Sequence, residues 1–273
     1  MTWSRAYLSR VSGDPGSPER DPLGSLEPLT RTSWSPWPLP EVLQGTPSTM
    51  ADVEARAARG APEGAVVVAE EQTAGRGRRG RSWESPARAG LWLSVLLRPS
   101  TPVEQLGWLP LVVGVAVARA LRSEAGVDAR VKWPNDVLVG DGKIAGVLSE
   151  RLGDGAVIVG VGVNVDQVEA ELPEGGTSLR LLGSDADRTR LLVQVLDHVA
   201  QAYRSWQAGE RMAAAYEDLS VTLGRDIVAD LGDRSVTGRA VRLGPSGELV
   251  IEQADGEEIV VSAGDVTLRR MPP

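Results

Sequence analysis

The chain has no cysteine among its 273 residues. This absence excludes disulfides, zinc–thiolate sites and a thiol nucleophile, and nothing ties the chain to an oxidising compartment. Phenylalanine is also absent, and the one histidine, His198, lies at the flank of an apolar helical stripe, where we expect a solvated helix residue. An acyl intermediate on cysteine is therefore excluded, and one on histidine is disfavoured.

The chain carries a net negative charge, which does not favour binding to an anionic surface. Its formal charge is −8 and its pI is about 4.9, which argues against a mainly electrostatic binder of nucleic acid or membrane. The longest apolar stretch, Leu106 to Leu121, is interrupted by Pro110 and Arg119 and is too short to span a bilayer. No signal peptide precedes it, so we expect a cytoplasmic protein with no nucleic-acid or membrane partner.

Lysine and asparagine are almost absent. The chain has only two of each, and arginine supplies every other basic side chain. Arginine cannot replace a compact ammonium donor at a phosphate or carboxylate site, so the surviving lysines are candidate functional groups. Chance clustering is the alternative. The four residues are Lys132, Asn135, Lys143 and Asn164.

Residue composition and hydrophobic periodicity divide the chain into three parts. Residues 1–38 are rich in Pro, Ser, Gly and Arg without periodicity, which predicts a mostly disordered extension. With 42% hydrophobic residues, the remainder can form a core domain and a small appended one. We place these domains at 39–221 and 222–273.

Hydrophobic periodicity predicts mixed secondary structure in the larger domain. The 49–60 segment has a capping pattern and a glycine stop, typical of a short helix, and 103–125 predicts a longer one. Apolar residues over 187–220 recur with a helical period and predict one or two further helices. The predicted strands cover 65–69, 90–97, 130–133, 136–139, 144–150 and 156–165.

The C-terminal part is predicted to form a small β-barrel, because short strand patterns alternate with Gly-Asp, Pro-Ser-Gly and Asp-Gly turns. The expected fold class is therefore α+β. The four predicted strands cover 226–231, 235–243, 248–253 and 257–262.

A run of alternating glycine and arginine, Gly75 to Arg81, follows the first predicted strand and formally matches G-x-G-x-x-G. A dinucleotide-binding turn would need a helix at its last glycine and an acidic residue further on, and neither follows. An RNA-binding tract is unlikely in an acidic protein with ordered strands on both sides. The third interpretation is a mobile loop whose guanidinium groups close over a phosphate and a carboxylate.

Lys132 to Asp136, with the sequence KWPND, brings a cation, an amide and a carboxylate together at a strand end. Such a group can bind polyphosphate, orient Mg²⁺ and orient or deprotonate an amine. A simple strand-end turn is the alternative. Lys143 begins a hairpin strand and points toward the same face if the strands pair in order; otherwise it is an exposed hairpin lysine.

Taken together, these motifs resemble the biotin protein ligase family from about Gly45 to Arg270. They are EQTAGRGRRGRSW at 71–83, KWPND at 132–136, GKIAG at 142–146 and GVGVN at 160–164, in the family's order and approximate spacing. The resemblance implies a catalytic domain like that of class II aminoacyl-tRNA synthetases, with a mixed sheet and helices, followed by an SH3-like barrel.

The resemblance also implies a biotin site. Polar residues at a helix start and a glutamine beside the loop would hold the ureido ring, and Met50 stands where the family usually has asparagine. Helix capping is an alternative or additional role for Ser48 and Thr49. The implied biotin-binding residues are Ser48, Thr49, Gln72, Arg76, Gly77, Arg78, Lys143 and Gly162.

ATP or the adenylate would occupy the adjoining region. The implied residues are Gly75, Arg76, Arg78, Arg79, Arg81, Trp83, Lys132, Asn135, Lys143 and Asn164. Trp83 would pack near the adenine, and Asp136 would face the acceptor lysine. No firm metal site is implied beyond Mg²⁺ on the ATP phosphates, near Asn135. The implied catalytic residues are Arg78, Lys143, Asp136 and Lys132.

The implied reaction uses ATP to form biotinyl-AMP and then transfers biotin to a lysine of a biotin carboxyl carrier domain of an acyl-CoA carboxylase. We expect a monomer or weak homodimer. The alternatives are an ATP-dependent lipoate ligase and a non-catalytic biotin-binding module. A biotin-responsive repressor would need a winged helix, for which the residues before Gly45 are too few and too rich in proline.

Overall fold

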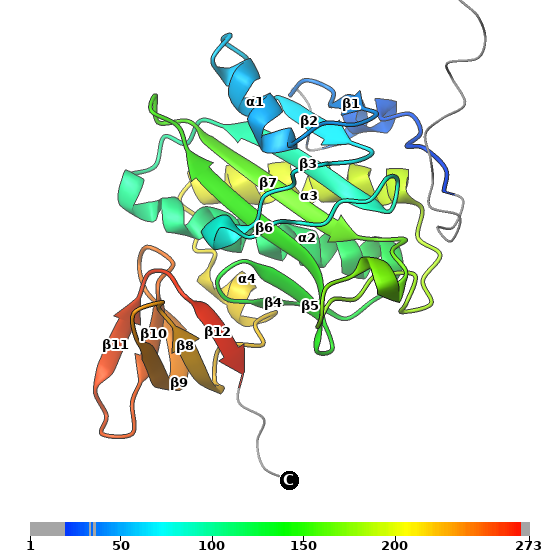
Figure 1. The fold of residues 1–273 in the computed structure, drawn as a ribbon. Helices are drawn as coiled ribbons and strands as arrows, with labels where there is room; N and C mark the ends of the chain where they lie inside the picture. Colours follow the sequence, from blue (N-terminus) through cyan, green and yellow to red (C-terminus); the bar gives the residue numbers. More distant parts are fainter. Residues whose placement is uncertain (1–19, 33, 35–36, 269–273) are drawn as a thin grey trace, which may run out of the picture.

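The computed structural model describes residues 20–32, 34 and 37–268. It contains a seven-stranded sheet in the order β1-β2-β3-β7-β6-β5-β4 and a separate five-stranded sheet (Figure 1). In the larger sheet β1 and β2 are parallel and all other neighbours are antiparallel. Its strands are β1 Glu41–Leu43, β2 Val66–Ala69, β3 Gly90–Leu97, β4 Ala129–Lys132, β5 Asp136–Val139, β6 Gly142–Arg151 and β7 Val157–Asn164.

Two long helices, α2 (Leu109–Ala125) and α3 (Arg188–Gln207), cover one face of this sheet. The short helix α4 (Ala213–Glu217) then leads toward the second sheet. The predicted helix over 103–125 corresponds to η4 (Val103–Trp108) followed by α2. Contrary to the expectation from its apolar stretch, this segment is long and apolar enough, by length and composition, to cross a membrane. Because 67% of its most apolar window is buried, it is the core helix of the fold.

The opposite face of the sheet is only partly covered. Helix α1 (Thr49–Ala57) packs there on β2, β3 and β7, in a small cluster that includes Met50 and Val53. Beyond the helix, the strands present glycine. Gly146 pairs with Gly162, and Gly160 lies next along β7 on the same face. At these positions the sheet itself contributes no side chains, which leaves room for side chains from other segments.

The smaller sheet is antiparallel, in the order β11-β10-β9-β8-β12. Two tryptophans of the larger domain donate hydrogen bonds to its 245–247 turn: Trp133 Nε1 to the Gly247 carbonyl at 3.0 Å, and Trp108 Nε1 to the Pro245 carbonyl at 2.9 Å. Its strands are β8 Asp226–Asp230, β9 Ser235–Leu243, β10 Leu249–Glu252, β11 Glu258–Val261 and β12 Asp265–Leu268.

The structure confirms the predicted α+β class. The predicted strand over 90–97 coincides with β3, and the first predicted helix ends three residues later than α1 does. Two strands, β1 and β12, were not predicted. Each is short and mixes acidic with apolar residues, so it lacks the continuous apolar run that identified β2. The boundaries between domains remain a prediction.

The predicted disordered extension over 1–38 is wrong for its described part. We call residues 20–32, 34, 37 and 38 the strap; the remainder of 1–38 lies outside the described residues. The strap includes the short helix η2 (Glu27–Arg31), and Leu29 and Trp34 have no exposed surface. Trp34 meets Trp37 edge-on, with ring centres 4.9 Å apart. The strap buries apolar side chains without a regular period, so pattern recognition misses it.

We predict that Trp34→Ala will lower the free energy of unfolding by about 3 to 5 kcal/mol, the cost of removing a large buried aromatic side chain. Denaturant unfolding would measure it. Arg31→Ala, which changes an exposed residue of the same strap, should stay close to the parent chain. A loss below about 1 kcal/mol for Trp34→Ala would contradict the assignment of Trp34 to the core.

Candidate functional site

A cavity of about 500 Å³ opens above the glycine face of the sheet. Its walls come from the start of α1, the Gly-Arg loop, the β4–β5 turn, residues 171–176 and residues 265–267 of the smaller sheet. The structure thus brings together all the predicted site residues except Gly75 and Arg79. Those lining the cavity are Ser48, Thr49, Gln72, Arg76, Gly77, Arg78, Arg81, Trp83, Lys132, Asn135, Asp136, Lys143, Gly162 and Asn164.

The start of α1 presents an unpaired hydroxyl at the cavity. Ser48 is the N-cap residue, yet its side chain makes no capping hydrogen bond. Instead the Gln72 Oε1 accepts from the backbone N–H of Thr49 at 2.9 Å and from its hydroxyl at 3.0 Å. The Ser48 Oγ is buried and has no partner among the described residues. Because buried polar groups are normally hydrogen-bonded, this atom is suited to a polar ligand.

Met50 also lines the cavity, at the position that departs from the family pattern. Its side chain is buried, and its Sδ lies 3.0 Å from where a Cβ on Gly160 would be. The missing side chain at Gly160 leaves room for the thioether. At this position the cavity therefore presents an apolar, polarisable surface instead of an amide.

Lys143 and Asp136 form an ion pair inside the cavity. The Lys143 Nζ lies 2.5 Å from the Asp136 Oδ1 and 5.2 Å from the centre of the Trp83 ring. Lys132 is opposite Asp136 in the β4–β5 register. A carboxylate, an ammonium group and an aromatic ring thus meet at one place in a cavity that Lys132 also lines, and an anionic ligand there can compete with Asp136 for Lys143.

Trp83 lies against two glycines of the sheet. A Cβ on Gly162 would approach its indole to 2.5 Å, and one on Gly146 to 2.9 Å. The Trp83 Nε1 is buried without a partner among the described residues. The indole therefore depends on glycine at both positions for its place in the cavity.

The two polar atoms of the Asn135 side-chain amide have different partners. Its Nδ2 donates to the Val147 carbonyl at 2.7 Å, and its Oδ1 accepts from Arg78 Nη1 at 3.4 Å. Both residues also line a second cavity of about 500 Å³ behind the β4–β5 turn. Within the described part of the chain, no group of three or more His, Asp or Glu side chains could hold a metal ion.

The Asn164 amide is occupied within the protein. Its Nδ2 donates to the Thr177 carbonyl at 3.0 Å and the Lys143 carbonyl at 3.4 Å, while its Oδ1 accepts from Gln167 Nε2 at 2.9 Å. These bonds link the end of β7 to the backbone that carries Lys143. A direct contact between Asn164 and a ligand stays a prediction.

The Gly-Arg loop reaches across to the smaller sheet. Arg78 and Arg79 each lie 3.5 Å from the carboxylate of Asp265, and Arg81 forms an ion pair with the same carboxylate. Burial lowers the pKa of Arg78 while Asp265 opposes the change, but an arginine remains charged at neutral pH. Arg76 points elsewhere and pairs with Glu150 at 3.1 Å.

Sequence reasoning missed Asp265, because no motif surrounds it and its partners are far away in the chain. It also placed Gly75 and Arg79 in the ligand site. Neither lines the cavity: Gly75 packs against the Trp83 carbonyl, and Arg79 turns toward the smaller sheet, where its Nη2 donates to the Asp230 carbonyl at 3.2 Å. The predicted ligand contacts of Gly75 and Arg79 are therefore not supported by their positions, because neither residue lines the cavity.

We predict that Asp265→Asn will speed tryptic cleavage within 76–81 by about fivefold, the effect of losing about 1 kcal/mol from the contact between loop and sheet. Mass spectrometry of the earliest fragments would measure it. Asp230→Asn is the matched control, because the Asp230 side chain accepts from Gly232 and only its backbone carbonyl meets the loop. Equal cleavage in both variants would show that the ion pairs with Asp265 do not hold the Gly-Arg loop against the smaller sheet.

Comparison with known proteins agrees with this arrangement. Residues 42–167 match the Biotin/lipoate A/B protein ligase family, and residues 222–269 match the Biotin protein ligase C terminal domain. A structure of the biotin protein ligase from Aquifex aeolicus in complex with biotin and ATP is similar, with a TM-score of 0.74 and 33% identity, covering 85% of this chain and 99% of that one.

Two curated relatives extend the likeness. The bifunctional ligase/repressor BirA of Bacillus subtilis is 32% identical, over 82% of this chain and 71% of its own length. The biotin–acetyl-CoA-carboxylase ligase of Mycobacterium tuberculosis is 41% identical, over 85% of this chain and 90% of its own length. With identity of this extent over both domains, the chain belongs to the biotin protein ligase family.

Proposed function

We propose that the chain joins biotin to AMP at the expense of ATP and then transfers biotin to a lysine of a carboxylase carrier domain. The observation that carries the proposal is that the Gly-Arg loop, Lys143, the KWPND turn and the unpaired Ser48 hydroxyl all line one cavity. The acceptor we propose is the carrier domain of acetyl-CoA carboxylase, after the name of the Mycobacterium tuberculosis relative. A cytoplasmic monomer or weak homodimer remains our expectation.

The two ends of the cavity suit the two ends of biotin. The ureido ring would lie near the start of α1, where Ser48, Thr49 and Gln72 supply polar atoms and Met50 supplies an apolar surface. The carboxylate would then lie near Lys143 and Arg78. This orientation pairs the unmatched hydroxyl and brings the reacting group to the cations.

In the first step a biotin carboxylate oxygen attacks the α-phosphorus of ATP, and the bond to the β-phosphate oxygen breaks, releasing pyrophosphate. Lys143, Lys132 and Arg78 stabilise the charge on the phosphorus oxygens. Lys143 would exchange Asp136 for this anion. The Asn135 Oδ1, which among the described residues has only the 3.4 Å hydrogen bond from Arg78, would hold Mg²⁺ together with the ATP phosphates, and the ion would supply charge neutralisation there.

In the second step the acceptor amine attacks the carbonyl carbon of the mixed anhydride, and AMP leaves. Once Lys143 has turned to the phosphate, the Asp136 carboxylate is available to orient the incoming amine and accept its proton. The ion pair between Lys143 and Asp136, at 2.5 Å, would thus separate so that each residue takes one of the roles that the two steps require.

The experiment that tests this proposal is biotin-dependent exchange of labelled pyrophosphate into ATP with Mg²⁺ present, and with lipoate and octanoate in parallel. Exchange with biotin alone is the expected result. Exchange with lipoate instead would assign the chain to a lipoate ligase, and no exchange with any acid would leave only a binding module.

We predict that Lys143→Met will slow biotin-dependent exchange by at least about 100-fold, because a cation that stabilises the transition state is lost. Arg98→Met is the matched control: it also removes the cation of an ion pair, with Asp154 at 3.0 Å, but outside the cavity. Near-normal exchange in a folded Lys143→Met protein would rule out the proposed role of Lys143.

We also predict that Gly162→Ala will weaken ATP binding by about tenfold, because the new methyl group would displace Trp83 and overpacking typically costs about 1 to 3 kcal/mol. Calorimetric titration with ATP would measure the change. Gly153→Ala should bind normally, since nothing lies within 4 Å of its added Cβ. Unchanged binding by Gly162→Ala would show that the indole does not contribute to the nucleotide site.

A further inference from the structure

Arg20, in the strap, has a largely buried side chain that contacts the loop following β7. The Arg20 side chain is only 5% exposed, and its guanidinium donates twice to the Glu171 carboxylate, at 3.1 and 2.5 Å. It also donates to the backbone carbonyls of Asp166 at 2.8 Å and Ala87 at 3.4 Å. Arg20 therefore joins three segments that are far apart in the sequence.

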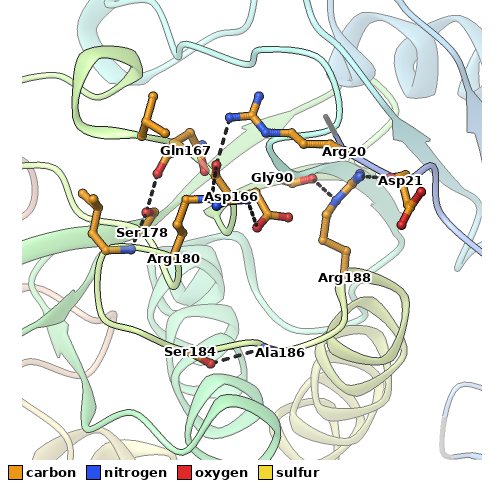
Figure 2. A network of polar contacts seen from close by, with 12 residues as sticks. Arg20, Asp21, Gly90, Asp166, Gln167, Ser178, Arg180, Ser184, Ala186 and Arg188 are labelled. Atoms are coloured by element: carbon orange, nitrogen blue, oxygen red, sulfur yellow. Dashed lines mark hydrogen bonds and ion pairs between the residues drawn. The ribbon is translucent and has the colours of Figure 1, made fainter. Parts of the chain in front are cut away.

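A second arginine fixes the strap beside it. Arg188, at the start of α3, donates to the Asp21 carbonyl at 2.9 Å and to the Gly90 carbonyl at 3.2 Å (Figure 2). It also pairs with the buried Glu70 carboxylate at 2.5 Å. The same carboxylate accepts from the Leu23 N–H at 2.6 Å. The strap is thus anchored at the end of β2, two residues before Gln72 of the cavity.

The loop that Arg20 contacts becomes a wall of the cavity. We call residues 171–176, all of which line it, the pocket wall. The pocket wall lies along the backbone of Lys143: the Lys143 N–H donates to the Gly175 carbonyl at 2.8 Å, and the Thr177 N–H donates to the Lys143 carbonyl at 2.9 Å. The position of the pocket wall is therefore coupled to that of Lys143.

The pocket wall has little regular structure of its own. Between β7 and α3 the structure has only one 3₁₀ turn, η5 (Glu169–Glu171), and a connection of this length needs outside contacts to keep one shape. The Glu171 carboxylate accepts from the Val168 N–H at 3.0 Å as well as from Arg20. Burial alone would raise the pKa of Glu171, but these hydrogen bonds lower it below its ordinary value, so the pair is ionic at neutral pH.

We propose that the strap supports the ligand site from outside the cavity, and that Arg20 is a positioning residue. Through Glu171 it holds the pocket wall against the bound biotinyl adenylate and so determines how long that intermediate is retained. This inference rests on the proposed ligase function. It assigns to the N-terminal segment a role in retaining the intermediate and not merely in stabilising the core.

The test compares Arg20→Met and Glu171→Gln with Arg31→Met in the full chain. The last is a matched control, because Arg31 is an exposed arginine of the same strap. Biotinyl adenylate is formed on the protein, and its release into solution is followed after a chase. We expect Arg20→Met and Glu171→Gln to release it about tenfold faster, the effect of losing a hydrogen bond to a charged group. The KM for biotin should rise while kcat of adenylation changes little.

Two results would overturn the inference. One is release from Arg20→Met at the rate of Arg31→Met. The other is equally fast release from Leu29→Ala, which loosens the strap against the core without touching Glu171, measured where that variant is fully folded. The double variant Arg20→Met/Glu171→Gln should release the adenylate within about twofold of the faster-releasing single variant, because both changes remove the same contact.

Failure of the inference can be told from failure of the proposed function. If the unaltered chain forms no biotinyl adenylate, the proposed function fails before any variant is compared. If the unaltered chain forms the adenylate and releases it at the same rate as Arg20→Met, only the proposed role of Arg20 fails. Denaturant unfolding of each variant shows whether it is folded during the measurement.

Discussion

The site depends on a patch of sheet that has no side chains. Along β6 and β7 one face carries Ala145, Val147, Val161 and Val163, which are buried in the main core, while the other presents glycine at 146, 160 and 162. Because residues alternate between the two faces of a strand, the same strands can close the core below and leave a cavity above. Trp83 lies on this glycine floor, and Met50 uses the space left at Gly160.

Apart from Lys132, for which no ion pair is seen among the described residues, the cations of the cavity and of the Gly-Arg loop have a carboxylate partner. Lys143 pairs with Asp136, Arg76 with Glu150, and Arg78, Arg79 and Arg81 with Asp265. Such pairing reduces the cost of bringing positive charges together before a ligand arrives. It also means that an anion must compete with carboxylates, so binding rearranges existing ion pairs instead of filling a bare positive site. This arrangement favours a ligand with several anionic groups, which can replace more than one carboxylate.

The sequence was most informative where chemistry or periodicity is local. The scarcity of lysine and asparagine pointed to Lys132, Asn135, Lys143 and Asn164, and all four line the cavity. A continuous apolar run identified β3. The contacts that escaped prediction join distant residues: Asp265 with the Gly-Arg loop, and Arg20 with Glu171. Ser48 shows the same limit, because Gln72, a residue from another segment, serves α1 in place of the expected cap.

Both ends of the described chain support the same site. The smaller sheet binds the Gly-Arg loop through Asp265, and the strap binds the loop after β7 through Arg20. Neither loop contains more than a 3₁₀ turn, so neither can keep catalytic groups within a fraction of an ångström by its own hydrogen bonds. The rigid sheet carries Lys143, Asp136 and the glycine floor, whereas the parts that must admit and enclose a ligand are fastened from outside by ion pairs. Such contacts can open without unfolding the core, because the loops they fasten lie outside its packed layers.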